Sequence, residues 1–188
     1  MSSNWPKAGP NFVPAYQVSG IPYITSSVAN EVKPSYTGGT SPEAIHVSFP
    51  YVTRDITIRN TGTQALRVGF TKRGVYAPGD HLPATMNGGE KVIVDSANEN
   101  DGRNYFIIPS SGSVAGTEDG MSQNAGGLQN VFQFNIRCTD LYFLSDDTQA
   151  SSDAVANRTS FTVYAGLTGI SRYDFPTITG SNGFEGVG

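Results

Sequence analysis

Residues 55–71, DITIRNTGTQALRVGFT, hold two alternating runs of apolar and polar residues that a short polar link separates. Alternation with a period of two is the pattern of a β-strand that buries one of its faces. The link, residues 60–64, contains an asparagine and a glycine, which favour tight turns and tolerate positive φ. We therefore expect a β-hairpin whose apolar side chains share one buried face. Those side chains are Ile56, Ile58, Leu66, Val68 and Phe70.

A hairpin alone cannot cover its own apolar face, so the rest of the chain must supply a second sheet. Strands are expected at residues 44–49, 53–59, 65–71, 91–95, 104–109, 131–138, 141–145 and 161–168. Eight antiparallel strands joined by unequal loops favour an all-β fold, an eight-stranded single jelly-roll sandwich built from two Greek keys. An immunoglobulin-like sandwich is the alternative, but its cysteine and tryptophan signature is missing.

The alternating strands also predict which side chains form the core between the two sheets. Each of these residues lies in phase with its neighbours on an apolar face. The predicted core consists of Ile56, Ile58, Val68, Phe70, Phe132, Phe134, Ile136, Phe161 and Val163.

The first part of the chain differs in composition from the strands that follow it. Residues 1–36 combine five prolines with aromatic residues, a composition that resists helix but carries too many aromatic side chains for a solvated tail. We interpret 1–42 as an extended N-terminal arm, 43–170 as the jelly-roll domain and 171–188 as a glycine-rich C-terminal tail. Alternatively, residues 18–25 add an edge strand to the chain's own sandwich. The candidate partner-interface residues of the arm are Trp5, Phe12, Tyr16 and Tyr23.

Composition and charge restrict the function classes. The 188 residues carry a net charge of −4 and no run of lysine or arginine, so direct nucleic-acid binding is not expected. Cys138 is the one cysteine, which excludes an intrachain disulfide and predicts a small buried side chain. No stretch approaches the roughly 18 apolar residues of a membrane span, and MSSNWPKAGP lacks the apolar core of a secretory signal. A cytosol-like compartment is expected.

No motif predicts catalysis, a cofactor or a metal site. His46 and His81 lie far apart in the sequence, and Asp80 beside His81 is interpreted as a turn aspartate next to a solvated histidine. Residues 95–102, DSANENDG, resemble a calcium loop but lack its ligand spacing and closing glutamate. The acidic pairs at 118–119 and 146–147 are interpreted as solvated turn residues. We therefore expect a protein that is not an enzyme.

Three segments resemble a known family. They are NFVPAYQVSGIPYITSS at residues 11–27, ITIRNTGTQALRVGFT at 56–71 and NVFQFNIRCTDLYFLSD at 130–146. These segments resemble the penton proteins of large icosahedral double-stranded DNA viruses such as the algal chloroviruses, and the resemblance covers residues 11–173. Penton proteins are pentameric vertex capsid proteins with a single jelly roll. The family has no catalytic motif to transfer to this chain.

The resemblance implies a structural capsid protein of the virion, made in the host cytoplasm, that forms a homopentamer at each vertex. Its neighbours would be the major capsid protein and minor capsid proteins of the same shell. The alternative is a carbohydrate- or ligand-binding jelly-roll module of a viral surface or fibre protein, which calls for an exposed aromatic platform or a calcium site. The jelly roll by itself does not decide between these functions.

Overall fold

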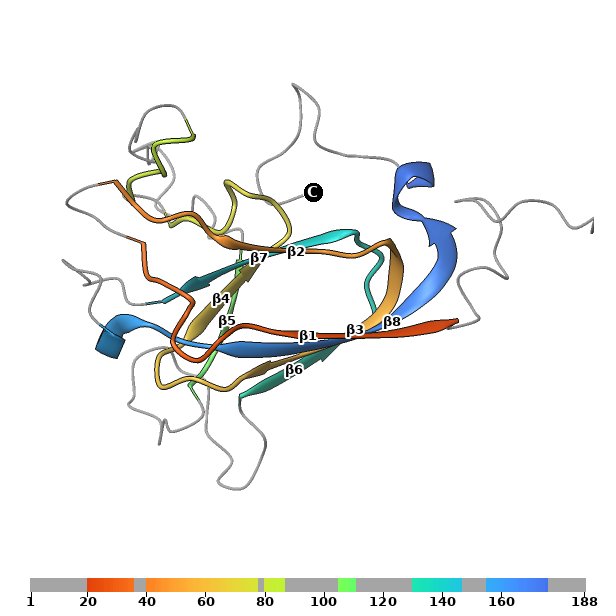
Figure 1. Cartoon of the computed structure of the whole chain (residues 1–188), viewed down its shortest axis with the longest axis horizontal. Coiled ribbons are helices and arrows are strands. Elements are labelled where there is room, and N and C mark those ends of the chain that lie inside the picture. Colours follow the sequence, from red (N-terminus) through yellow and green to blue (C-terminus); the bar gives the residue numbers. More distant parts are fainter. Residues whose placement is uncertain are drawn as a thin grey trace, which may run out of the picture.

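Two four-stranded antiparallel sheets face each other in the computed structural model of this protein (Figure 1). The structure describes residues 20–35, 40–77, 80–86, 105–110, 130–146 and 155–175. Eight strands and two short 3-10 helices lie within these ranges, so the predicted all-β sandwich is confirmed. The strands are β1 (Ile21–Ser26), β2 (Ile45–Ser48), β3 (Tyr51–Asn60), β4 (Leu66–Gly69), β5 (Tyr105–Ile108), β6 (Val131–Phe134), β7 (Asp140–Ser145) and β8 (Phe161–Ser171). The 3-10 helices are η2 (Val155–Asn157) and η3 (Arg172–Asp174).

The strands pair in a nested order. β4 pairs with β5, β3 with β6, β2 with β7 and β1 with β8, and all four pairs are antiparallel. Two further ladders, β3 with β8 and β4 with β7, complete the sheet orders β1-β8-β3-β6 and β2-β7-β4-β5. A long hairpin that is rolled up, so that successive pairs fall alternately in the two sheets, gives this arrangement. It is the pairing expected of an eight-stranded jelly roll.

The edge strand expected within residues 18–25 is confirmed as β1, which lies at the end of its sheet beside β8. Pro22 lies in this edge strand, where a residue without an amide proton is tolerated because one side of the strand has no partner strand. Val32 also bonds to Thr159, so the sandwich begins before residue 42, where the expected arm ends.

Other strands form with shifted ends. β6 ends at Phe134 instead of residue 138, and β8 continues to Ser171 instead of ending at 168. The strand expected at 91–95 lies outside the described residues.

The predicted hairpin within residues 55–71 is wrong, although both of its strands form. β3 pairs with β6 and β8 in one sheet, whereas β4 pairs with β5 and β7 in the other. The two runs therefore face each other across the core instead of lying side by side. Each apolar face covers the other, which explains why both runs alternate so regularly.

The link after β3 turns the corner between the sheets because buried side chains hold it there. The Asn60 amide nitrogen donates to the carbonyls of Gln64, Ile108 and Pro109 at 2.8–3.1 Å, and its oxygen accepts from the Gly62 amide at 3.0 Å. A Cβ at Gly62 would lie 2.3 Å from the hydroxyl of Thr159. Neither Asn60 nor Gly62 adopts the positive φ expected for a hairpin turn. The link therefore spans the roughly 10 Å between packed sheets.

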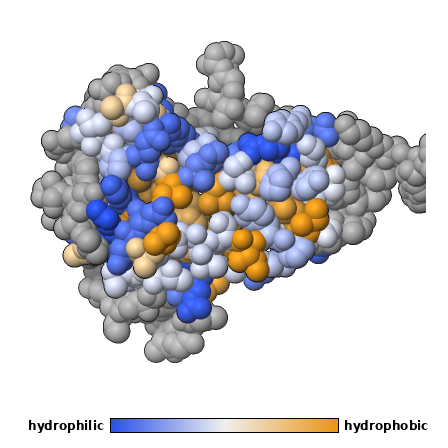
Figure 2. Space-filling view, viewed as in Figure 1, coloured by the Kyte–Doolittle hydropathy of each residue, from blue (hydrophilic) through white to orange (hydrophobic). Residues whose placement is uncertain are grey.

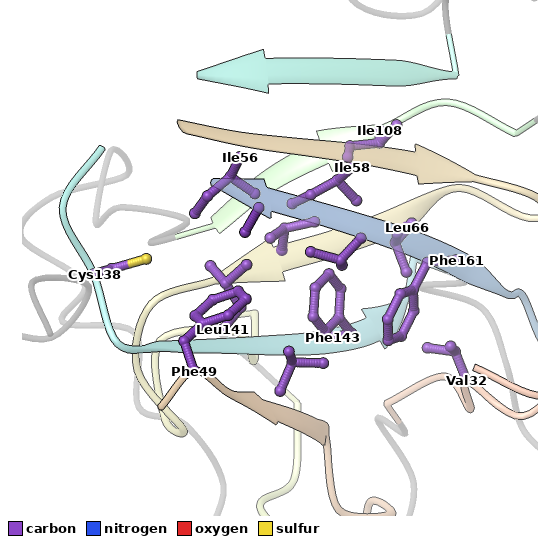
Figure 3. Packing of buried hydrophobic residues seen from close by; sticks show 14 of the residues in the cluster. Val32, Phe49, Ile56, Ile58, Leu66, Ile108, Cys138, Leu141, Phe143 and Phe161 are labelled. Atoms are coloured by element: carbon purple, nitrogen blue, oxygen red, sulfur yellow. The ribbon is translucent and has the colours of Figure 1, made fainter. Parts of the chain in front are cut away.

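The core fills the space between the two sheets (Figure 3). At its centre Phe143 of β7 stacks on Phe161 of β8, with ring centroids 4.0 Å apart and an interplanar angle of 17°. Such a pair contributes beyond the area that it buries, by about 0.5–1.5 kcal/mol. The buried core residues are Val32, Val47, Phe49, Ile56, Ile58, Leu66, Val68, Ile108, Cys138, Leu141, Phe143, Phe161, Val163, Ala165 and Leu167.

The prediction that Cys138 is buried is confirmed, and its pKa shows the effect of that environment. Burial raises the pKa of the thiol to about 11, although a hydrogen bond with Thr53 lowers it in part. The Cys138 thiol is therefore a core side chain and stays protonated at neutral pH.

A second apolar cluster covers part of the outer face of the β2-β7-β4-β5 sheet. Val75, Tyr76 and Leu82, from the chain that follows β4, pack against Leu144 of β7. The Tyr76 hydroxyl donates to the carbonyl of Pro42 at 2.8 Å, which ties this layer to the chain before β2. On the side of the molecule seen in Figure 2, apolar residues are interspersed among weakly polar and charged ones.

Candidate interaction surface

Four phenylalanines form a cluster on the side of the sandwich where the sheets end in β5 and β6. We call this cluster the aromatic seam: Phe70, which follows β4, Phe106 of β5, and Phe132 and Phe134 of β6. Phe106 stacks on Phe132 with ring centroids 5.4 Å apart, and Phe132 lies 5.3 Å from Phe134. Phe70 meets Phe106 and Phe134 edge to face at 5.9 and 6.2 Å. The four rings make one continuous apolar surface.

The aromatic seam is open to solvent although its side chains have the phase of core residues. Phe132 is paired with Ile58 and Phe134 with Ile56, so both point to the inner face of their sheet, as the sequence predicts. Yet Phe106 is 43% and Phe132 37% exposed, and Phe134 is half-buried. The prediction that Phe132 is a core residue is therefore wrong. Its strand lies at the sheet edge, where the facing sheet also ends.

The other predicted core residues divide in the same way. Buried as predicted are Ile56, Ile58, Val68, Phe161 and Val163. Phe70 and Ile136 are only half-buried and pack against the core from its margin. The alternation of apolar residues therefore predicts correctly which face of a paired strand points to the core. The position of the strand relative to the sheet edge decides how completely each of these side chains is buried.

The two strands beside the aromatic seam lack the usual protection of sheet edges. β5 reads Tyr-Phe-Ile-Ile and β6 reads Val-Phe-Gln-Phe, with no charged residue and no proline. Proteins use charges, prolines and bulges to keep an edge strand from pairing with another chain. β1 carries such protection in Pro22. The β5/β6 side is therefore the part of the described sandwich best suited to contact another protein surface.

A polar cluster of different character lies at the start of β7. Asp140 accepts from the His46 imidazole at 2.7 Å and from the Arg172 guanidinium at 3.1 Å. Partial burial by itself raises the pKa of Asp140, but hydrogen bonds from Thr139 and His46 and the charge of Arg172 outweigh it, so the pKa is lowered. The carboxylate is thus held in its charged form.

This polar cluster connects three elements. It joins β2, β7 and η3, and the His46 ring stacks on Tyr142 with centroids 4.6 Å apart and an interplanar angle of 3°. A histidine beside a carboxylate also occurs in sites of general acid–base catalysis. Among the described residues, however, no nucleophilic side chain is hydrogen-bonded to His46. The cluster therefore connects β2, β7 and η3 by side-chain hydrogen bonds and ion pairs.

Arg67 forms a third cluster on the outer side of β4, and its own side chain is fully buried. Its guanidinium donates to Asp80 at 2.7 Å, to Asp146 at 2.5 Å and to Ser35 at 2.9 Å. Burial lowers the pKa of Arg67, but the neighbouring Tyr105, Asp146 and Asp80 outweigh it and raise the pKa above its ordinary value.

The interpretation of Asp80 as a turn residue beside a solvated histidine is wrong on one point. Asp80 is buried, and its carboxylate binds Arg67, the Ser35 hydroxyl and the Ala77 amide. Asp146 likewise binds Arg67 instead of being a solvated turn residue. Sequence gave no signal of these ion pairs, because 13 and 79 residues separate the partners.

The predicted interface residues of the arm have different outcomes. Tyr23 is half-buried in β1 and meets Phe49 edge to face at 5.2 Å, so it packs on the core of its own domain. Trp5, Phe12 and Tyr16 lie outside the described residues, as do the calcium-like run 95–102, the acidic pair 118–119 and Asp147.

Among the residues that the structure describes, no group of three or more histidine, cysteine, aspartate or glutamate side chains could hold a metal ion. Within the same ranges, no helix has the length and apolar character needed to cross a membrane.

Comparisons of the chain with protein-family models, with curated proteins and with solved structures find no match.

Proposed function

We propose that this protein is a structural capsid subunit that forms the pentameric vertex of an icosahedral virus shell. In this role it acts without catalysis or a cofactor, and it binds other copies of itself and the major and minor capsid proteins around it. The protein would be made in the host cytoplasm and reside in the virion, at the capsid vertex. The resemblance of three segments to penton proteins supports this proposal.

The observation that carries the proposal is the open β5/β6 side of the sandwich. It combines two uncharged edge strands with an aromatic seam whose rings are up to 43% exposed. Exposed aromatic clusters on a soluble domain mark contact surfaces. Subunits that close a ring do so through head-to-tail contacts between two different surfaces of each copy. A single apolar side on each copy is suited to be one half of such a contact.

The mass of the purified full-length chain tests the proposal. Five chains of 20.0 kDa form a ring of about 100 kDa, whereas a monomer remains at 20.0 kDa. Native mass spectrometry and light scattering across the micromolar range should show the ring. Because only 15% of the residues are charged, apolar contacts should dominate, and the ring should persist at high salt. Monomers at every concentration and in both low and high salt would contradict the proposal.

One observation bears on the alternative, a carbohydrate- or ligand-binding module. The aromatic seam is the exposed aromatic platform that such a module needs. However, its four phenylalanine rings bear no hydrogen-bonding group, and binding sites for small polar ligands combine apolar walls with placed polar groups. The seam therefore favours an apolar protein partner over a sugar. Saturable binding of oligosaccharides by the monomer would support the alternative.

A further inference from the structure

We propose that the aromatic seam of one copy binds residues 1–19 of a second copy of this chain. This inference rests on the proposed self-association and names one surface and one segment that produce it. It assigns a binding surface to the N-terminal aromatic residues Trp5, Phe12 and Tyr16.

The chemistry of the seam defines what can bind there. Its exposed rings belong to Phe106 and Phe132, and the strands that carry them contain no charge. An occupant must therefore bring apolar or aromatic side chains with few charges, since a charge placed there would lose its hydration without a partner. Aromatic side chains suit best, because offset and edge-to-face contacts between rings add to the burial of area.

Residues 1–19 match these requirements. They contain Trp5, Phe12 and Tyr16, and Lys7 is their one charged side chain. The prolines at 6, 10 and 14 limit the conformations of the free segment, so less entropy is lost when it binds. Tryptophan and tyrosine are also the residues most often found as binding anchors.

The direction of β1 favours a second copy over the same copy. The strand register places Phe132 and Phe134 of β6 in the same rows as Thr25 and Tyr23 of β1. Gly20 lies three to five residues from these rows, or about 10–17 Å along the strand at about 3.4 Å per residue. The chain enters β1 at the end remote from its own seam and then runs toward it. A segment bound to its own seam would have to reverse its direction before Gly20, whereas a neighbouring copy requires no reversal.

The length of the segment is sufficient for this exchange. Fifteen residues separate Trp5 from Gly20, and they span up to about 50 Å when extended. This distance exceeds the width of a four-stranded sheet, which is about 15 Å between its outer strands. Trp5 can therefore reach a seam on an adjacent subunit.

Trp5 is the one tryptophan of the chain, so tryptophan fluorescence reports on this segment alone. We would prepare two full-length variants. The donor, Phe106→Ser/Phe132→Ser, keeps Trp5 and loses the seam. The acceptor, Trp5→Ala/Phe12→Ala/Tyr16→Ala, keeps the seam and contains no tryptophan. Both substituted seam residues are partly exposed, so the donor should fold, and circular dichroism and thermal melting verify this. If the donor does not fold, Phe106→Ser alone replaces it.

The expected result is a shift of the donor's emission to shorter wavelength as acceptor is added, with saturation. A matched control acceptor that also carries Phe106→Ser/Phe132→Ser should cause no shift. Absence of a shift with the intact acceptor overturns the inference. In the wild-type chain, an emission maximum at short wavelength that is independent of concentration and persists in monomers would show binding within one copy, and this also overturns it.

The mass of the wild-type chain separates this inference from the proposed function. A ring of about 100 kDa together with no shift in the mixing experiment would leave the capsid proposal standing and remove the seam as the receptor. Monomers at every concentration would remove both. A wild-type emission maximum at the wavelength of solvent-exposed indole within an intact ring would show that Trp5 is not buried in the seam, and would contradict the inference.

Discussion

Two pairs of stacked phenylalanines bridge the sheets, one buried and one exposed. Phe143 and Phe161 belong to the inner strands β7 and β8 and are 0% and 1% exposed. Phe106 and Phe132 belong to the edge strands β5 and β6 and are 43% and 37% exposed. Both pairs point inward from alternating or apolar strands. The difference in exposure between the two pairs comes from the position of each strand in its sheet. The periodicity of apolar residues does not reveal that position.

The same side chain therefore has two uses in this fold. In the inner strands, phenylalanine rings fill the core and stabilise one domain. At the open side, rings of the same phase remain available to another surface.

The largest effect is expected at the buried pair. Phe143→Ala removes a fully buried ring and should lower the free energy of unfolding by about 3–5 kcal/mol. Urea denaturation of the monomeric fraction, followed by circular dichroism, measures this change. If Phe143→Ala lowered the free energy of unfolding by less than substitutions in the seam do, the assignment of β7 and β8 to the centre of the core would be contradicted.

The buried ion pairs of Arg67 should give the next largest effect. Asp80→Ala leaves the guanidinium with Asp146 and without its contact at 2.7 Å, so we expect a loss of about 3 kcal/mol. The same urea denaturation assay applies. Glu31→Ala removes an exposed carboxylate that accepts a hydrogen bond from the Val28 amide in its own turn; it serves as the control and should change stability by less than about 0.5 kcal/mol.

Substitution in the aromatic seam should affect stability less than substitution in the core. Phe134→Ala, at a half-buried position, should cost about 1–2 kcal/mol, and Phe106→Ala about 1 kcal/mol. Thermal melting of the monomers measures both. Losses as large as that of Phe143→Ala would show that the seam is a closed part of the core.

The smallest effect concerns the polar cluster and depends on pH. The lowered pKa of Asp140 means that its charged form stabilises the folded state above the ordinary pKa of 3.8, and that this contribution disappears as the pH falls through the lowered value. Asp140→Asn should therefore cost about 1 kcal/mol at pH 7, because the ion pairs are partly exposed. Urea denaturation between pH 7 and pH 2 should show the difference from wild type vanish at low pH. A difference that is independent of pH would contradict this explanation.

The sequence predicted the strands better than their arrangement. Alternation located β2, β3, β4, β6 and β8, and the edge position of β1 followed from Pro22. The hairpin was wrong because Asn60 and Gly62 occur both in tight turns and in links between sheets. What distinguishes the two cases here is the contact of the link with Thr159 and with the end of β5, which are distant in sequence.

The aromatic seam was missed for a related reason. Phe132 and Phe134 alternate like core residues, and nothing in their own strand shows that it lies at an edge. A signal was present in β5, where Tyr-Phe-Ile-Ile is apolar at four successive positions and therefore carries apolar side chains on both faces. Together with the lack of charge in both strands, this run could have identified an exposed apolar side.

The mass of the Phe106→Ser/Phe132→Ser variant tests most directly whether the open side of the sandwich is an association surface. Light scattering should give about 100 kDa for the wild-type chain and 20.0 kDa for the variant, while circular dichroism and a cooperative melting transition show that the variant is still folded. A folded variant that still assembles to the wild-type mass would contradict the account.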